Sequence, residues 1–214
     1  MNRQQPTSRR SGGFTLIELL IATVVFSLVL LVITTSILQF SKQYYKGVVA
    51  SSTQGVTRSL IDDVSQSLKF NGNYAALSGG NGYCVGTSKR YSFALNKQVE
   101  DSGTLSAHQA RHGLVSDTVA NCNSATPALT FGASSAFPGS VVNSRELLGQ
   151  HMRLAKFSIT NPAEGMYIVT VRFIYGDDDL LTSATSPDAN CKSTACSQFC
   201  ATSELTTTVM KRVK

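Results

Sequence analysis

An uninterrupted apolar run near the N-terminus constrains the fold of this chain more than any other feature. Residues 19–38 contain no charged side chain and consist mainly of Leu, Ile and Val. At about 1.5 Å of rise per residue, a helix of this length spans the roughly 30 Å hydrocarbon core of a bilayer. The run therefore predicts a membrane-spanning helix, and the rest of the chain is expected to fold outside the lipid.

A basic leader precedes the run. Residues 1–13 contain Arg3, Arg9 and Arg10 and no acidic residue. Positive charge beside a membrane helix marks the cytoplasmic side, so the residues after the helix are expected to lie outside the cytoplasm. The whole chain of 214 residues has a net charge of +6, which is too small and too dispersed to indicate nucleic-acid binding by itself. Without the three leader arginines the net charge is +3.

Glu18 is a carboxylate at the start of the apolar run. Such a group in lipid costs about 2.5–3.5 kcal/mol and usually has a partner, yet the next basic residue is Lys42. Phe14 is one helical turn before Glu18, so cleavage between Gly13 and Phe14 would place a new α-amine beside the carboxylate. This amine can come from the same chain or from a neighbouring one. An ordinary secretory signal has a shorter apolar core and a clearer cleavage site, and an uncleaved signal anchor leaves Glu18 unexplained.

The sequence GFTLIELL at residues 13–20 resembles the class III signal of type IV prepilins and pseudopilins. The resemblance implies that a prepilin peptidase cleaves after Gly13 and that Phe14 is N-methylated. It also implies that Glu18 pairs with the Phe14 amine of an adjacent subunit during assembly. The expected product is a filament whose core is a bundle of these helices.

The apolar segment departs from the family pattern in its second half. Many major pilins of this family have a helix-breaking proline there, whereas residues 30–38 contain none and include Thr34 and Thr35. A Thr hydroxyl can donate back to a carbonyl of the helix without breaking it. The departure favours a minor pilin or a pseudopilin over a major pilin.

The helical pattern continues beyond the apolar run. Residues 14–70 contain no proline, and apolar side chains in residues 41–70 recur at spacings of four and seven, which predicts an amphipathic helix that covers a sheet. We expect a cleaved leader (1–13), a transmembrane and filament-core helix (14–40), an amphipathic second half (41–70) and a globular head (71–214). The expected apolar stripe consists of Val49, Val56, Leu60, Ile61, Val64 and Leu68.

After a turn-rich loop at residues 71–82, the pattern changes to the period of two that is typical of strands. Residues 152–160 and 166–175 flank a turn at residues 161–165 and predict an antiparallel hairpin. The expected fold class is α+β, a pilin-like long helix packed on an antiparallel sheet. Further strands are expected at residues 90–95, 128–131 and 202–213, the last an edge strand because it ends in the basic residues Lys211, Arg212 and Lys214.

All five cysteines, Cys84, Cys122, Cys191, Cys196 and Cys200, follow the membrane segment, so the expected topology favours disulfides. Cys200 borders the predicted last strand and can close a small loop with Cys191 or Cys196, which matches the disulfide-bounded C-terminal region of pilins. Cys84 and Cys122 can form a second bridge, with one cysteine left over, but the sequence does not fix the connectivity. The C-x4-C-x3-C spacing lacks the CxxC pairs and nearby His of a zinc site.

Two other groups of side chains are candidate metal ligands. His108 and His112 are four residues apart, but no Glu stands where a zincin needs it and no third ligand is obvious, so a solvated loop or strand edge is expected. Asp177, Asp178 and Asp179 follow the predicted hairpin and are weak Ca²⁺ candidates, as some pseudopilin heads bind calcium in a loop. Their spacing is not that of an EF-hand, and a solvated turn is expected. We therefore expect no metal and no cofactor.

The sequence contains no G-x-S-x-G, Walker A, G-x-G-x-x-G or HExxH motif, and we do not expect an enzyme. Certain minor pilins take up DNA, and scattered basic residues can gather into a DNA-binding patch, although periodicity does not show that they do. These residues are Lys89, Arg90, Arg111, Arg145, Arg153, Lys156 and Arg172.

The sequence thus predicts a minor pilin, a structural subunit that enters a type IV pilus through its N-terminal helix. Its expected partners are other pilin subunits, the prepilin peptidase and the pilus assembly platform in the membrane; DNA or a surface ligand of the head has no direct support. Before assembly it is expected as a single-pass protein of the cytoplasmic membrane with its head outside, and later in the pilus at the cell surface. The alternatives are a pseudopilin of a type II secretion or competence (DNA-uptake) system and, from another class, a signal-anchored binding protein or enzyme outside the cytoplasm.

Overall fold

The computed structural model of the chain describes residues 13–131, 142–193 and 197–212. These described residues form one long α-helix, α1 (Leu16–Asn71), then ten β-strands and two short 3-10 helices. The α+β class predicted from the sequence is confirmed, because one long helix precedes sheets that are largely antiparallel. The chain divides into two compact units, Met1–Gln43 and Tyr44–Lys214, and α1 contributes residues to both.

In the first unit, α1 exposes its apolar surface on all sides. The helix contains a window of mean hydropathy 2.9, none of which is buried, and it is long and apolar enough to cross a membrane. The hydroxyls of Thr34 and Thr35 donate to the carbonyls of Leu30 and Leu31 at 2.8 and 3.1 Å, as expected. These polar side chains are therefore satisfied within the helix itself, which is what a lipid-facing helix requires.

In the second unit, α1 buries one face. Within the predicted stripe, Val49 and Val56 are half-buried. Thr53 and Thr57 are fully buried on the same face, although the apolar pattern did not include them. Their hydroxyls donate to the carbonyls of Val49 and Thr53 at 2.8 Å, so only their methyl groups need partners. The other members of the stripe are confirmed as buried: Leu60, Ile61, Val64 and Leu68.

The first sheet has the strand order β1-β2-β3-β6-β7, and each neighbouring pair is antiparallel. Only β3 corresponds to a predicted strand, at residues 90–95. The loop expected at residues 71–82 is wrong in part, because β1 pairs there with β2 and brings Ala75 opposite Cys84. The bounds are β1 (Tyr74–Ala76), β2 (Gly82–Val85), β3 (Lys89–Phe93), β6 (Leu114–Thr118) and β7 (Val142–Glu146).

The second sheet has the order β10-β9-β8-β4-β5. Its neighbours are antiparallel except for β4 and β5, which are parallel and only two residues long. The predicted edge strand is confirmed, since β10 ends the sheet. The bounds are β10 (Ala201–Met210), β9 (Met166–Tyr175), β8 (Met152–Ala163), β4 (Gln98–Val99) and β5 (Gln109–Ala110).

The hairpin of β8 and β9 is confirmed with a tighter turn than the sequence indicated. Ala163 pairs with Met166, so the turn consists of Glu164 and Gly165 instead of residues 161–165. Gly165 has φ +72°, a conformation that glycine adopts without steric cost. β8 is therefore three residues longer than hydrophobic alternation suggested, whereas β9 has the predicted bounds.

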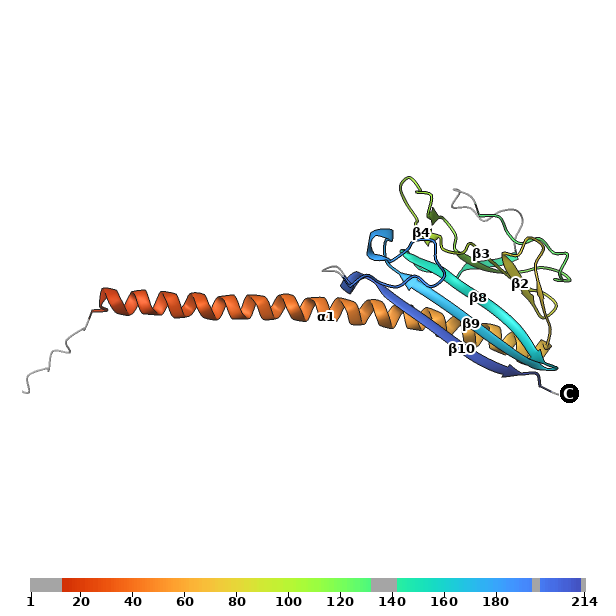
Figure 1. The fold of residues 1–214 in the computed structure, drawn as a ribbon, viewed down its shortest axis with the longest axis horizontal. Helices are drawn as coiled ribbons and strands as arrows, with labels where there is room; N and C mark the ends of the chain where they lie inside the picture. Colours follow the sequence, from red (N-terminus) through yellow and green to blue (C-terminus); the bar gives the residue numbers. More distant parts are fainter. Residues whose placement is uncertain (1–12, 132–141, 194–196, 213–214) are drawn as a thin grey trace, which may run out of the picture. The chain divides into compact units, whose positions relative to one another are not determined.

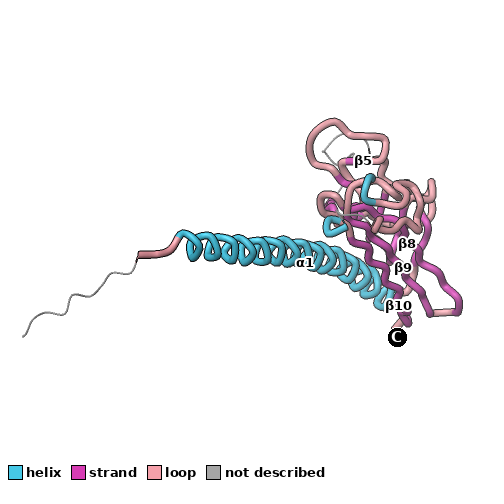
Figure 2. Tube along the Cα trace, turned by 60° about the vertical axis from the view of Figure 1, so that its left-hand side comes forward, coloured by secondary structure: helices cyan, strands magenta, loops and turns pink. Residues whose placement is uncertain are grey.

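A single apolar cluster joins α1 to both sheets. Figures 1 and 2 show β8, β9 and β10 as neighbouring strands, with the C-terminal half of α1 beside β10. At the centre of the cluster, the ring of Phe157 in β8 lies 5.2, 5.6 and 6.1 Å from the rings of Tyr83, Phe93 and Tyr91. The stripe on α1 therefore covers the sheets, as its periodicity predicted.

The strand expected at residues 128–131 is wrong. Only Pro127 forms an isolated bridge there, to Ser78. The polar backbone atoms of this segment have side-chain partners: the Pro127 carbonyl accepts from Arg90 at 2.8 Å, and Leu129 N–H donates to Ser92 Oγ at 3.0 Å. Apolar composition suggested a strand, but these side chains replace the ladder of hydrogen bonds.

Candidate functional site

The N-terminus of α1 is organised by a reciprocal contact between Thr15 and Glu18. Glu18 Oε2 accepts from the backbone N–H and from the hydroxyl of Thr15, both at 2.9 Å. The backbone N–H of Glu18 donates to Thr15 Oγ1 at 3.3 Å. This is a capping box, which satisfies free N–H groups at the first turn of a helix. The T-x-x-E spacing that signals it was available in the sequence, and our sequence reasoning missed it.

The capping box gives the Glu18 carboxylate a defined position. Both of its hydrogen bonds from Thr15 fall on Oε2, and neither uses Oε1. A negative charge in the first turn also interacts favourably with the helix dipole. Glu18 is thus held at the end of an apolar helix, close to the residues at which cleavage is predicted.

Gly13 and Phe14 precede α1 and lie outside regular secondary structure. Phe14 is 87% exposed, and a Cβ added at Gly13 would have no heavy atom within 4 Å. The peptide bond between them is therefore sterically open to a protease. Gly13 and Phe14 directly precede the helical turn that carries Glu18, while cleavage, methylation and subunit pairing remain predictions.

Four of the five cysteines form two disulfides. Cys84 in β2 is joined to Cys122, and Cys191 is joined to Cys200, with Cα–Cα distances of 5.6 and 5.7 Å. These pairings are among those the sequence left open. Cys196 lies outside the described residues. The second bridge connects the segment after β9 to the residue just before β10, and Cys200 is only 3% exposed.

The three consecutive aspartates do not converge. Asp178 lies 2.7 Å from a guanidinium nitrogen of Arg153, whose side chain is 1% exposed. Asp177 Oδ1 accepts from Gln98 Nε2 at 2.6 Å and lies 3.2 Å from His151 Nδ1. In the described parts of the chain there is no group of three or more His, Cys, Asp or Glu side chains that could hold a metal. Asp178 instead pairs with buried Arg153, and Asp177 accepts from buried Gln98.

The expectation of solvated histidines is wrong for His112, which is 7% exposed. Its Nδ1 lies 3.3 Å from Glu146 Oε2, and His108 is separated from it by the short strand β5 instead of one helical turn. Glu146 also accepts from the backbone N–H groups of Gly113 at 3.1 Å and Leu114 at 2.9 Å. Burial raises the pKa of Glu146, while these N–H groups and His112 act in the opposite direction.

Most of the basic residues considered for DNA binding have internal partners. Arg90 donates to both oxygens of Asp117, at 2.9 and 2.5 Å, and both side chains are largely buried. Arg172 pairs with Glu204 at 2.9 Å. A guanidinium that is buried and paired is not available to phosphates, so these residues do not form the patch considered from the sequence.

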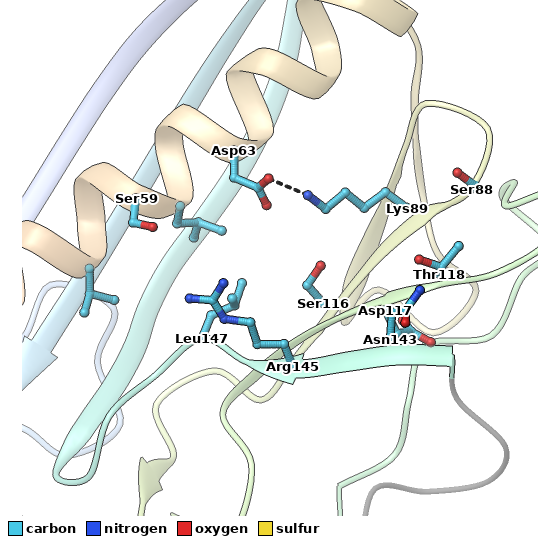
Figure 3. A pocket seen from close by; sticks show the side chains of 12 residues that line it. Ser59, Asp63, Ser88, Lys89, Ser116, Asp117, Thr118, Asn143, Arg145 and Leu147 are labelled. Carbon is cyan, nitrogen blue, oxygen red and sulfur yellow. Dashed lines mark hydrogen bonds and ion pairs between the residues drawn. The ribbon is translucent and has the colours of Figure 1, made fainter.

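A cavity of about 470 Å³ lies between α1 and the strands β3, β6 and β7 (Figure 3). On one side, Asp63 pairs with Lys89 at 2.5 Å and accepts from Tyr91 Oη at 2.7 Å. Burial, and the neighbouring Asp63 carboxylate, raise the pKa of Tyr91, so its hydroxyl remains a donor. Arg145 and Ser116 face the cavity from the opposite side. The sequence did not indicate this polar cavity, because its lining comes from four separate segments.

Residues 8–34 match the sequence family described as the prokaryotic N-terminal methylation motif. The match includes Gly13, Phe14 and Glu18 and ends within the apolar part of α1, so the whole head lies beyond it. No curated protein and no solved structure gives a significant match to the chain.

Proposed function

We propose that this chain, which carries the N-terminal methylation motif of type IV prepilins and pseudopilins, is a minor pilin that assembles into a type IV pilus through its N-terminal helix. The motif supports a type IV pilin-like protein or pseudopilin. Proteins with this pilin-type motif are structural, which supports a structural role over an enzymatic one. The finer assignment is our proposal.

The observation that carries the proposal is the arrangement of Thr15, Glu18 and Phe14 at the open end of α1. A prepilin peptidase cleaves the exposed peptide bond after Gly13, and the new amine of Phe14 is methylated. Glu18 then pairs with the Phe14 amine of an adjacent subunit. The capping box supports this step, because both of its hydrogen bonds from Thr15 to the carboxylate use Oε2 and neither uses Oε1.

The low dielectric constant of the lipid strengthens the pairing between Glu18 and the Phe14 amine. The attraction between two opposite charges increases as the dielectric constant falls, and an unpaired carboxylate beside lipid is unfavourable. A neighbour's ammonium group therefore recruits the subunit at the correct axial position. The exposed apolar surface of α1 then packs against the helices of other subunits, which explains why none of its apolar window is buried within one chain.

The same features support the proposed location and partners. The basic leader and the apolar helix fit a single-pass protein of the cytoplasmic membrane, whose head lies outside and is later carried into the pilus. The prepilin peptidase, an assembly platform in the membrane and other pilins are the partners of this pathway.

A pseudopilin of a type II secretion or competence system is the second candidate. The observation that favours it is the absence of proline from residues 14–70, which suits a pseudopilin as well as a minor pilin. Deletion of the pilus genes or of the secretion genes in the host separates the two, since only the relevant deletion leaves the protein unassembled.

The direct test is mass spectrometry of the protein in filaments sheared from cells. We expect a mature chain that begins at N-methylated Phe14 and is present in small amount beside a major subunit. A chain that keeps Met1, or one that begins beyond residue 50, would reject the pilin assignment. A correctly processed chain that never leaves the membrane fraction would favour a secretion pseudopilin.

A further inference from the structure

Three exposed aromatic rings form one patch in the second unit. Tyr44 and Tyr45 of α1 lie with their ring centroids 6.1 Å apart, and Phe199 of the 3-10 helix η2 (Ser197–Phe199) lies 6.0 Å from Tyr45. The three side chains are 62, 52 and 44% exposed. We call Tyr44, Tyr45 and Phe199 the aromatic patch. Contiguous exposed apolar surface of this kind indicates an interaction site.

The position of Phe199 is fixed by its neighbours in the chain. Cys200 is bonded to Cys191 and is 3% exposed, so the residue after Phe199 is anchored in the head. Gly176 lies close against this segment, with the Phe199 carbonyl 3.2 Å from the place of an added Cβ. Figures 1 and 2 both show the start of β10 beside α1. The disulfide thus holds an apolar ring toward solvent although the core is close by.

Two lysines lie beside the aromatic patch. Lys46 and Lys192 line one cavity of about 380 Å³ between α1 and the disulfide-bounded segment. Both residues are exposed, and Lys192 Nζ donates to the backbone carbonyl of Asp179 at 2.9 Å. Among the described residues that line this cavity there is no acid. The lining of the cavity therefore carries two positive charges and no negative one, which suits an anionic group.

Along the chain, the two tyrosines come soon after the segment that is predicted to span the membrane. Tyr44 and Tyr45 follow the last residue of the apolar run, residue 38, by six and seven positions in the same helix, or about 9–10 Å. The headgroup layer extends about 5–8 Å beyond the hydrocarbon core on each side. Helical side chains lean toward the N-terminus of their helix, a direction that favours contact of these two rings with the headgroup layer.

We propose that, before assembly, the aromatic patch together with Lys46 and Lys192 lies in the headgroup layer of the membrane and binds anionic phospholipids. This inference rests on the membrane-spanning helix of the proposed function. Tyrosine is enriched at this depth because its ring is apolar and its hydroxyl is polar. Each lysine near an anionic membrane surface increases the binding constant for that surface about fivefold. The head is thereby held against the membrane on the side that carries the Cys191–Cys200 bridge.

The chain has no tryptophan, so one substitution gives a unique fluorescent reporter of this contact. Phe199→Trp is placed in the full-length chain and reconstituted into vesicles of phosphatidylcholine, with or without an equal part of phosphatidylglycerol. Lipids brominated near the top of their acyl chains then quench tryptophan that enters the interface. The matched control is Phe70→Trp, since Phe70 is 57% exposed but lies about 37 Å further along α1 than Tyr45.

We expect bromolipids to quench Phe199→Trp in the vesicles with phosphatidylglycerol and to leave Phe70→Trp unchanged. Lys46→Gln with Lys192→Gln should weaken the docked state about 25-fold in these vesicles, at about fivefold for each lysine. Lys69→Gln, at the far end of the helix, is the control for lost charge. Tyr45→Trp gives a second reporter that does not depend on the disulfide-bounded segment.

Several results would overturn the inference. Equal, weak quenching of Phe199→Trp, Tyr45→Trp and Phe70→Trp in a chain that resists alkaline extraction would show that the patch does not enter the lipid. Equal quenching with and without phosphatidylglycerol would exclude recognition of anionic headgroups. An unquenched Phe199→Trp chain that is also excluded from filaments would assign the patch to a second copy of the chain. Extraction of the chain by alkali would contradict the membrane-anchored state of the proposed function itself.

Discussion

Thr15 and Glu18 satisfy each other's hydrogen bonds at the start of α1, the hydroxyl accepting from one backbone N–H while the carboxylate accepts from the other. Glu18 therefore has two roles: it caps its own helix, and it carries a negative charge. Substitutions at these two positions can therefore distinguish helix stability from subunit recruitment.

Glu18→Ala removes both roles, and we expect a chain that is cleaved normally but does not enter filaments. Glu18→Gln keeps an oxygen that accepts from Thr15 but has no charge, so it should also be cleaved and fail to assemble. Thr15→Ala is the matched control, because it costs about 1 kcal/mol of capping but keeps the charge. Immunoblots of sheared filaments and membranes measure the partition. Wild-type amounts of Glu18→Ala in filaments would contradict the pairing.

The buried pair of Arg90 and Asp117 should be far more sensitive to substitution than a surface pair. Asp117→Asn leaves the guanidinium of Arg90 buried without a counter-charge, and we expect a loss of about 3–5 kcal/mol in the free energy of unfolding. Asp63→Asn is the comparison, because Asp63 and Lys89 have side chains that are 40 and 32% exposed, and about 1 kcal/mol or less is expected. Urea unfolding of the detergent-solubilised chain measures both. Equal losses would contradict this account of the head.

The two disulfides should stabilise the head to different extents. Cys84 and Cys122 are 38 residues apart, whereas Cys191 and Cys200 are 9 residues apart. Loop-closure entropy in the unfolded chain then predicts losses of about 4 and about 2.6 kcal/mol when each pair is replaced by alanine. Urea unfolding of both variants, with Cys196→Ala added to prevent exchange, tests this order. A larger loss of unfolding free energy for the Cys191–Cys200 variant would show that this disulfide acts mainly on the folded state.

Ionisation of the Glu146 carboxyl should lower the free energy of unfolding of the head as the pH rises. Burial raises the pKa of Glu146 in the folded chain above the ordinary value of 4.5. Its contribution to stability is therefore complete below pH 4.5 and is lost as the pH rises through the raised pKa of the folded state. Relative to Glu146→Gln, which does not titrate, the wild-type free energy of unfolding should fall across this interval.

Unfolding of both proteins in urea at a series of pH values measures this difference. Glu164→Gln, in the exposed turn of the β8–β9 hairpin, controls for the loss of one negative charge. A constant difference between wild type and Glu146→Gln from pH 4 to neutral would contradict a raised pKa.

The sequence allowed prediction of those parts of the structure whose information is local. The order of residues from Gly13 to Glu18 was enough to indicate the prepilin-type signal. The helical spacing of apolar residues from Leu60 to Leu68 was enough to predict the buried face of α1. The β8–β9 hairpin was equally accessible, because two long alternating segments flank a short turn.

The parts that were missed depend on partners far along the chain. Arg90 and Gln98 are buried in strands because Asp117 and Asp177 satisfy them, and nothing near either residue indicates this. Short strands such as β4, β5 and β6 therefore carry polar residues where the alternation rule expects apolar ones. The polar cavity at Asp63 was not predictable from the sequence for the same reason, since its lining comes from segments that only the tertiary fold brings together.

The two disulfides also limit how far the head can lengthen under mechanical load. A chain pulled from α1 and from its C-terminus can extend by about 3.5 Å for each residue that is freed. The bridges withhold the residues between Cys84 and Cys122 and between Cys191 and Cys200, or about 160 Å of contour length. An oxidised head is thus a short tether that transmits tension where a reduced one would give way by stretching.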